Sequence, residues 1–184
     1  MKLCIHRGTR EIGGTCVELE SSGQRILLDL GLPLNTKDVA SIPLPAVAGL
    51  TKADPSLLAI ILSHGHRDHW GLLPKARPDI SVVMGRDVER IMRAAADFVP
   101  DGFAPKASAY LENRKQLKLG PFSITPHLVD HSGFDAYAIE VEADGRRLFY
   151  SGDLRAHGNK GKLFEVMLNL TESESRRRGA IRLW

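Results

Sequence analysis

The chain has 184 residues, 43% of them hydrophobic and 26% charged, and its formal net charge is +3. These values are ordinary for a soluble globular protein and leave room for one domain with a substantial core. They exclude a membrane-spanning class, because no apolar run approaches the roughly 18 residues that a span requires. Residues 1–6 are too short and too quickly polar for a secretory signal.

Cysteine content favours a reducing compartment. Only Cys4 and Cys16 are present, so a disulfide framework is not expected and a cytoplasmic location is the default. The positive charge gives weak support for a nucleic-acid partner, because the sequence alone does not place it on one face.

The N-terminal third is predicted to form strands. Three short apolar-rich segments are separated by glycine and serine turn formers. These segments are residues 2–6, 15–20 and 25–29. Gly13-Gly14 could be mistaken for a phosphate-binding loop, but a strand rather than a helix follows it, which favours a turn. Residues 30–54, with three prolines, are predicted to be a long functional or mobile loop.

A histidine-rich loop follows the next predicted strand. The apolar run 57–62 leads directly into His64-Gly65-His66-Arg67-Asp68-His69, which is typical of a buried strand ending in a polar loop. Three imidazoles and a carboxylate this close together can converge only around something they bind, and a divalent cation is the obvious candidate. The alternative is a polar loop with ordinary surface histidines.

The remaining pattern mixes helices and strands. A helix is predicted at 87–98, with the apolar residues at 3–4 spacing facing the core; they are Val88, Ile91, Met92, Ala95 and Phe98. A short helix is predicted from 70–76 and another helix at 160–170. Strands are predicted at 80–84, 116–119, 122–128, 136–142 and 146–151, the last two joined by a hairpin turn at 143–145. This order suggests two sheets with helices outside.

Two later strands also end in side chains that can bind metal. Asp130-His131-Ser132-Gly133 follows the strand predicted at 122–128, and Ser151-Gly152-Asp153 follows the one at 146–151. Strand ends that meet at one edge of a sheet can assemble a site from residues distant in sequence. Three other histidines, His6, His127 and His157, have no place in this pattern and are interpreted as packed or surface residues.

Together these motifs resemble the metallo-β-lactamase superfamily, and most closely its ribonuclease J and β-CASP branch. The residues that carry the resemblance are His64-x-His66-x-Asp68-His69, His131-Ser132-x-x-Asp135-Ala136, Ser151-Gly152-Asp153, Arg10-Glu11-Ile12-Gly13-Gly14 and Leu28-Asp29-Leu30-Gly31. The similarity covers about residues 2 to 168. It implies an α+β fold, an αββα sandwich with a dinuclear metal site on one edge of the paired sheets.

Transferred to this sequence, the resemblance implies a complete set of roles. One metal would be held by His64, His66 and His131, and the second by Asp68 and His69, with Asp153 bridging the two. Asp29 would orient the metal-binding loop by hydrogen bonds. Imidazoles and carboxylates suit Zn²⁺ or Mn²⁺, and a water shared by two such ions becomes a nucleophile near neutral pH. Asp68 or Asp153 would position it as catalytic residues.

The sequence also departs from that family. A further histidine on a later strand and a β-CASP module are expected there, but neither is present in these 184 residues. We therefore expect a partial domain at 1–170, a disordered tail at 171–184 and a weak second metal site. Missing late strands would leave an exposed sheet edge that favours a homodimer.

The function that follows is hydrolysis of phosphodiesters, most plausibly RNA, by a metal-bound hydroxide. Asp153 stands where many β-lactam-hydrolysing relatives have a cysteine, which favours phosphodiester or thioester substrates. The alternatives are a hydrolase of small thioesters or cyclic phosphodiesters, and an inactive metal-binding fragment. No membrane partner is expected.

Overall fold

The computed structural model describes residues 1–99, 102–175 and 180–183. Its helices are α1 (Arg67–Trp70), α2 (Arg86–Ala95), α3 (Lys162–Ser175) and a 3-10 turn, η1 (Leu73–Lys75). Its strands are β1 (Lys2–Arg7), β2 (Cys16–Ser21), β3 (Gln24–Leu28), β4 (Leu57–Ile61), β5 (Val82–Gly85), β6 (Ala109–Leu111), β7 (Leu117–Leu119), β8 (Phe122–Leu128), β9 (Tyr137–Ala143), β10 (Arg146–Tyr150) and β11 (Ala180–Leu183).

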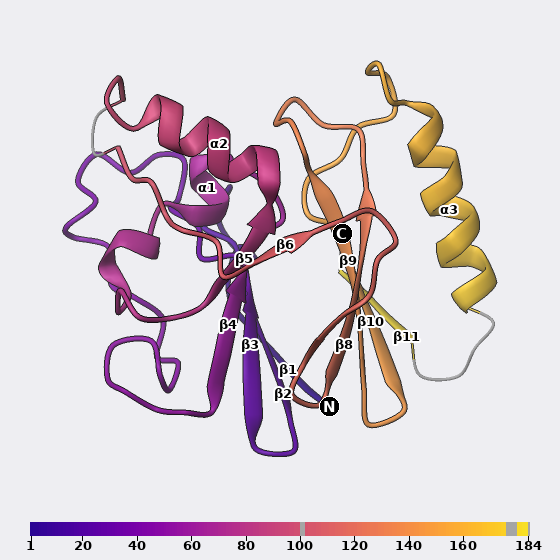
Figure 1. The fold of residues 1–184 in the computed structure, drawn as a ribbon, viewed down its shortest axis with the longest axis horizontal. Helices are drawn as coiled ribbons and strands as arrows, with labels where there is room; N and C mark the ends of the chain where they lie inside the picture. Colours follow the sequence, from indigo (N-terminus) through magenta and orange to yellow (C-terminus); the bar gives the residue numbers. More distant parts are fainter. Residues whose placement is uncertain (100–101, 176–179, 184) are drawn as a thin grey trace.

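These elements form a four-layered sandwich (Figure 1). One sheet has the order β1-β2-β3-β4-β5-β6 and the other the order β11-β10-β9-β8-β7. Helices α1 and α2 cover the outer face of the first sheet, and α3 covers the outer face of the second. The predicted αββα sandwich is confirmed, including its two sheets with helices outside.

One part of the core lies between the two sheets. Alternate residues of each strand point inward, which is the arrangement that a half-buried strand requires. The fully buried inward residues include Leu19, Ile26 and Ile61 from the first sheet and Phe122, Ile139 and Leu148 from the second. A second cluster of equal size lies between the first sheet and its helices, and a smaller one attaches α3 to the second sheet.

Strand direction brings four chain segments to one edge. Strands β3 and β4 pair in parallel, so the residues after Leu28 and after Ile61 leave the first sheet at the same end. In the second sheet, β8 and β10 both pair antiparallel with β9 and therefore also run in the same direction. The loops after β3, β4, β8 and β10 are those in which the sequence places candidate metal ligands.

Most predicted elements are present, with shifted ends. The predicted helix at 87–98 ends at Ala95 in the structure. Phe98 lies past this end and is 86% exposed, and Ile91 within the helix is 49% exposed, so the prediction that they belong to the core is wrong, whereas Val88 and Met92 are buried as expected. Strand β6 was not predicted, since three residues are too few to show an alternating pattern.

The C-terminal region is more ordered than the sequence suggested. Where a disordered tail was predicted over 171–184, α3 instead continues to Ser175 and residues Ala180–Leu183 form β11. The reason is the open side of β10, whose backbone groups pair in parallel with β11. The edge of this sheet is therefore β11 and not β10. The remaining predicted tail residues, 176–179 and 184, lie outside the described residues.

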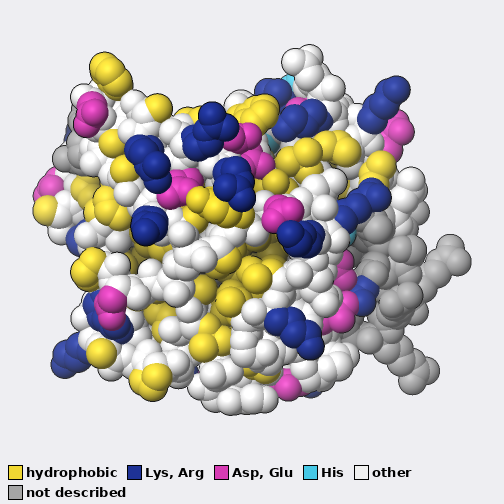
Figure 2. Space-filling view, viewed as in Figure 1, with side chains coloured by type: hydrophobic (Ala, Val, Ile, Leu, Met, Phe, Trp, Pro, Cys, Tyr) yellow, Lys and Arg dark blue, Asp and Glu magenta, His cyan; other side chains and the backbone are white. Residues whose placement is uncertain are grey.

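Within the described part of the chain, no helix is long and apolar enough to cross a bilayer. The face seen in Figure 2 carries Lys and Arg side chains interspersed with acidic and hydrophobic ones. A single large basic patch is not visible on that face, in agreement with the weak support that net charge gave to a nucleic-acid partner.

The two cysteines differ sharply in exposure, which gives a first testable prediction. Cys4 is exposed and Cys16 is fully buried, and neither is in a disulfide. Burial raises the pKa of the Cys16 thiol to about 12. We expect a colorimetric thiol reagent at pH 8 to modify one cysteine per folded chain and two in denaturant, because only the thiolate reacts. Modification of both cysteines in the folded chain would contradict the predicted burial.

Candidate metal centre

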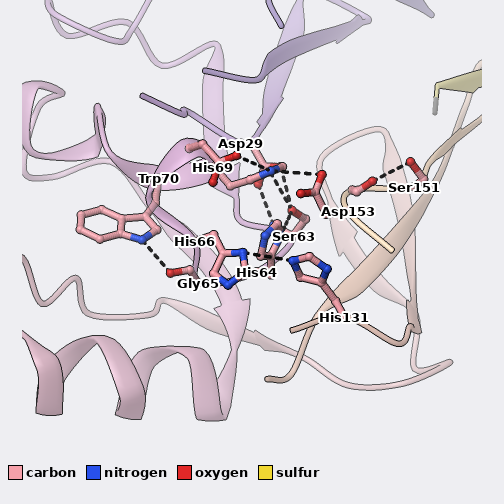
Figure 3. Close-up of polar contacts among 12 residues, drawn as sticks. Asp29, Ser63, His64, Gly65, His66, His69, Trp70, His131, Ser151 and Asp153 are labelled. Atoms are coloured by element: carbon pink, nitrogen blue, oxygen red, sulfur yellow. Dashed lines mark hydrogen bonds and ion pairs between the residues drawn. The ribbon is translucent and has the colours of Figure 1, made fainter. Parts of the chain in front are cut away.

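The candidate ligands meet at the edge where the four loops converge (Figure 3). Three histidines, His64, His66 and His131, form one group whose ligand atoms all lie within 4.8 Å of one another. A second group with the same spacing contains His64, His69 and Asp153. Residues 131 and 153 thus lie beside the 64–69 loop although they are far from it in sequence.

The first group consists of three imidazoles facing a common space. His131 Nε2 lies 3.1 Å from His66 Nδ1, and the His64 and His131 rings are edge to face with centroids 4.6 Å apart. The Nε2 atom of His64 is buried and has no hydrogen-bond partner among the described residues. A buried polar atom without a partner is costly, so this nitrogen marks a position where a cation would be accommodated.

The second group contains a carboxylate. His69 Nε2 lies 3.4 Å from Asp153 Oδ1 and 3.8 Å from Asp68 Oδ2. Asp153 is half-exposed, whereas His69 is buried. Asp68 is close to this group but does not belong to either set of mutually adjacent ligand atoms among the described residues. His64, not Asp153, is shared by the two sets; the bridging role predicted for Asp153 stays a prediction.

The buried Asp29 carboxylate holds the 64–69 loop in place. Its side chain is fully buried and accepts hydrogen bonds from the Ser63 amide at 2.7 Å, the Ser63 hydroxyl at 2.8 Å and the Tyr150 hydroxyl at 2.5 Å. His69 Nδ1 lies 2.7 Å from the same carboxylate. This pairing directs the opposite nitrogen of His69, Nε2, toward Asp153. Asp29 therefore contacts the candidate metal-binding loop directly; its predicted role in orienting bound metal ligands stays a prediction.

The electrostatics of the centre follow from this burial and pairing. Burial, reinforced by the neighbouring His69, lowers the pKa of His64 to about 3, so its ring is neutral and its lone pair is available. Burial alone would also lower the pKa of His69, but the charges of Asp29 and Asp153 raise it to about 10. The hydrogen bond from His69 is the main cause that lowers the pKa of Asp153 to about 2. Without a metal ion, the site therefore combines a neutral imidazole at His64, a protonated one at His69 and an ionised carboxylate at Asp153.

Backbone contacts fix the helical end of the loop. The carbonyls of Arg67, Asp68 and His69 accept hydrogen bonds from Leu32, Gly14 and Leu30, respectively. The Gly13-Gly14 turn and the Leu28–Gly31 motif, both singled out in the sequence, thus hold the metal-binding loop. Gly13 packs against Asp68, since a Cβ atom there would lie 2.7 Å from Asp68 Cβ.

Gly31 gives a second prediction. A Cβ atom at this position would lie 1.7 Å from the carbonyl oxygen of Asp68, so the loop would have to move. We expect Gly31→Ala to destabilise the chain by about 3 kcal/mol and to weaken metal binding, as measured by urea unfolding and metal titration. Gly65→Ala is the matched control, because its Cβ would make only an ordinary 3.5 Å contact with Val88. Equal effects of the two substitutions would contradict the prediction.

Other histidines are engaged elsewhere, as the sequence suggested. His6 Nε2 lies 2.7 Å from Glu18 and His127 Nε2 lies 3.0 Å from Glu140, while His157 is exposed. None of them belongs to either ligand group of the described residues. Sequence analysis missed Ser63 and Tyr150, which hold Asp29. Their positions, directly before His64 and before Ser151-Gly152-Asp153, were the available signal.

Comparison with known proteins agrees with this geometry. The family model described as Metallo-beta-lactamase superfamily matches residues 9–176. The chain belongs to the metallo-β-lactamase superfamily. This membership indicates a metallo-hydrolase, and the family resemblance seen in the sequence is confirmed.

Several curated relatives of this chain are named ribonuclease J or RNase J-like protein. An RNase J-like protein from Methanocaldococcus jannaschii is 25% identical over 166 residues, covering 83% of this chain and 36% of the relative. Ribonuclease J from Mycobacterium tuberculosis is 26% identical over 153 residues, covering 80% of this chain and 27% of the relative. The chain thus spans about a quarter to a third of the length of these relatives.

Solved structures show the same fold. A protein of unknown function from Enterococcus faecalis matches 99% of this chain and 49% of its own, with 19% identity and a TM-score of 0.75. A metallo-β-lactamase from Cronobacter sakazakii matches 93% of this chain and 73% of its own, with 21% identity and a TM-score of 0.60. At these identities the similarity concerns the fold alone.

Proposed function

We propose that this metallo-hydrolase chain cleaves phosphodiester bonds in RNA, with the converged histidines and aspartates as its metal centre. The observation that carries the proposal is the meeting of side chains from three distant segments, positions 64–69, 131 and 153, with ligand atoms within 4.8 Å in two overlapping groups. The ribonuclease J names of the curated relatives support RNA as the substrate.

The donor set fits divalent ions. His64, His66 and His131 offer three imidazoles for one ion, a set that suits Zn²⁺. Asp68, His69 and Asp153 offer two carboxylates and one imidazole for a second ion, which suits Zn²⁺ or Mn²⁺. A cation would satisfy the unpartnered Nε2 of His64 and would take the place of the proton that His69 carries between Asp29 and Asp153. When bound, such ions supply Lewis acidity that activates water and neutralises charge on phosphate oxygens.

The protein side chains then position the reactants. Asp68 and Asp153 lie on either side of His69 Nε2, where their oxygens can accept hydrogen bonds from an attacking water. Asp29 and Ser63 keep the His64 and His69 rings in fixed orientations (Figure 3). Fixed donors need no reorganisation during the reaction, which is the main electrostatic advantage of a folded site.

A groove beside the centre favours a polyanionic substrate over a small neutral one. It has a volume of about 620 Å³ and is lined by residues of the β1–β2 turn and of the 30–54 loop. Arg7 in this groove is bound to Glu11, whereas Arg10 and Lys37 form no ion pair with any residue that the structure describes. Its lining residue Ile12 is followed in the chain by Gly13, which packs on Asp68. Asp38 also lines the groove, so its lining carries three cationic and two anionic side chains, and Arg10 and Lys37 are the cations that can contact phosphates of a longer strand.

The experiment that tests the function compares three substrates. The full chain, stripped of metal with a chelator and reloaded with Zn²⁺ or Mn²⁺, is incubated with single-stranded RNA, a generic phosphodiester and a thioester. We expect hydrolysis of RNA that requires metal. Hydrolysis of the thioester alone would replace the proposal with a small-molecule hydrolase. Metal binding without hydrolysis of any of the three would identify an inactive metal-binding fragment.

The groove provides a third prediction. Each phosphate contact on a single strand contributes about 0.7 to the slope of log affinity against log salt. We expect Arg10→Ala combined with Lys37→Ala to raise the KM for RNA and to reduce that slope by about 1.4, with little change for the generic phosphodiester. The measurement is the KM at several salt concentrations. An unchanged slope would remove the groove from the substrate path.

The proposal also includes the cellular compartment and the oligomeric state of the protein. The unpaired thiols of Cys4 and Cys16 support a reducing cytoplasm. We also propose a homodimer that forms through an exposed sheet edge; in this structure one edge of the second sheet is β11, which pairs with β10. Sedimentation of the purified chain would test the dimer.

A further inference from the structure

The loop that carries His131 presents a large apolar side chain beside the metal centre. Phe134 is 56% exposed, and what distinguishes it from other exposed aromatic residues is its position next to the candidate ligands. It follows Gly133, whose backbone packs against the imidazoles: a Cβ atom there would lie 3.1 Å from His64 Cδ2 and 3.3 Å from His66 Nε2. Phe134 is therefore at the rim of the proposed active site.

Hydrogen bonds fix the backbone of the loop that carries Phe134. On its C-terminal side, the Asp135 carboxylate accepts a hydrogen bond at 2.9 Å from the Asp87 amide at the start of α2. The Tyr137 amide donates to the carbonyl of Ser63 at 2.9 Å, and the Val129 amide donates to the carbonyl of Ala136 at 3.0 Å. Because hydrogen bonds already fix the loop backbone before and after Phe134, little backbone conformational entropy is lost when this side chain binds a ligand.

The ammonium group of Lys160 lies over the Phe134 ring. Lys160 Nζ lies 4.9 Å from the centroid of the Phe134 ring, a cation–π distance. Lys160 belongs to the segment that follows Asp153, so the pair connects the loops that carry His131 and Asp153. An aromatic face next to a lysine is the combination that binds single-stranded nucleic acid, in which bases stack and phosphates pair with the cation.

We propose that Phe134 stacks on a nucleobase adjacent to the bond that is cleaved, with Lys160 contacting a neighbouring phosphate. The proposal rests on the proposed action on RNA and gives the site a preference for unpaired strands, because a base inside a duplex cannot present its face to the ring. A thioester or a simple phosphodiester has no base for Phe134 to contact. The residue therefore determines substrate class and does not take part in bond cleavage.

The test is binding of the metal-free full chain to two labelled strands by fluorescence anisotropy. One strand is single-stranded RNA and the other is the same sugar-phosphate chain without bases. We expect Phe134→Ala to weaken binding of the RNA roughly tenfold and to leave binding of the abasic strand unchanged. Phe134→Trp should retain or improve RNA binding, because it keeps a stacking face.

Phe98→Ala is the matched control. Phe98 is 86% exposed but lies beyond the C-terminal end of α2, opposite the end that contacts Asp135. It should not change binding of either strand. Equal RNA affinity of the wild-type chain and the Phe134→Ala chain would overturn the proposal. A change in oligomeric state on Phe134→Ala, with RNA binding unchanged, would overturn it too and identify Phe134 as a contact between two copies.

Failure of this proposal can be separated from failure of the proposed function. If metal-dependent hydrolysis of RNA persists while Phe134→Ala has no effect on RNA binding, only the stacking role is wrong. If no phosphodiester is hydrolysed by the metal-loaded wild-type chain, the proposed function itself is wrong.

Discussion

Replacement of His66 by alanine should reduce metal-dependent hydrolysis of RNA about a thousandfold or more. His66 is one of only three imidazoles in the group that also contains His64 and His131. A Lewis acid contributes several kcal/mol to stabilising a transition state, and each 1.36 kcal/mol changes the rate tenfold. The measurements are the hydrolysis rate and the metal content per chain after dialysis, both of which should fall in His66→Ala.

The control for this prediction is His157→Ala. His157 is exposed and lies outside both ligand groups of the described residues, although it follows Asp153 by only four positions. Rate and metal content should both be unchanged. Since His66 is partly exposed, His66→Ala should unfold at nearly the wild-type urea concentration. A full rate in His66→Ala would refute the assignment of the first metal position.

Replacement of Asp29 by alanine should cause the largest loss of stability. The fully buried carboxylate accepts hydrogen bonds from Ser63 and Tyr150 and pairs with His69. Removing it leaves several buried polar groups without a partner, and one of them, His69, has a raised pKa and therefore carries charge. Breaking a buried pair on one side costs about 3–5 kcal/mol, which urea unfolding of the metal-free chain would measure.

Two variants calibrate that result. Tyr150→Phe removes a single hydroxyl donor to Asp29 and should cost about 1 kcal/mol. Asp79→Ala removes an exposed aspartate that pairs with Arg77, and it should change stability little, since exposed ion pairs contribute little. If Asp29→Ala were no more destabilising than Asp79→Ala, the Asp29 network would not support the metal-binding loop.

The positions of the ligands were predictable because strand patterns are local. The apolar run 57–62 and the strand before Asp130 could be read from residue type alone, and parallel strand ends meet at one edge. The convergence of His131 and Asp153 with the 64–69 loop followed from that and from the family motifs. The details within the centre did not follow, because they depend on side-chain packing between both sheets.

Three differences illustrate this limit. The Tyr150–Asp29 hydrogen bond joins residues 121 positions apart, and nothing in either local pattern specifies it. Ile91 matches a helical apolar stripe but is 49% exposed, because the buried face of its helix is centred on Val88, Glu89 and Met92 and Ile91 lies to one side of it. Strand β11 forms because β10 offers an open edge, which is a property of the folded sheet and not of the polar, arginine-rich sequence before it.

The sharing of His64 has a consequence for how the centre fills. Its Nδ1 lies 3.0 Å from the Ser63 hydroxyl, so only Nε2, with a single lone pair, is left to donate to a cation. One lone pair cannot serve two ions, so an ion held by His64, His66 and His131 would leave Asp68, His69 and Asp153 for a second one. If the proposed centre takes up two ions, we therefore expect them to bind one after the other, the ion with three imidazoles first.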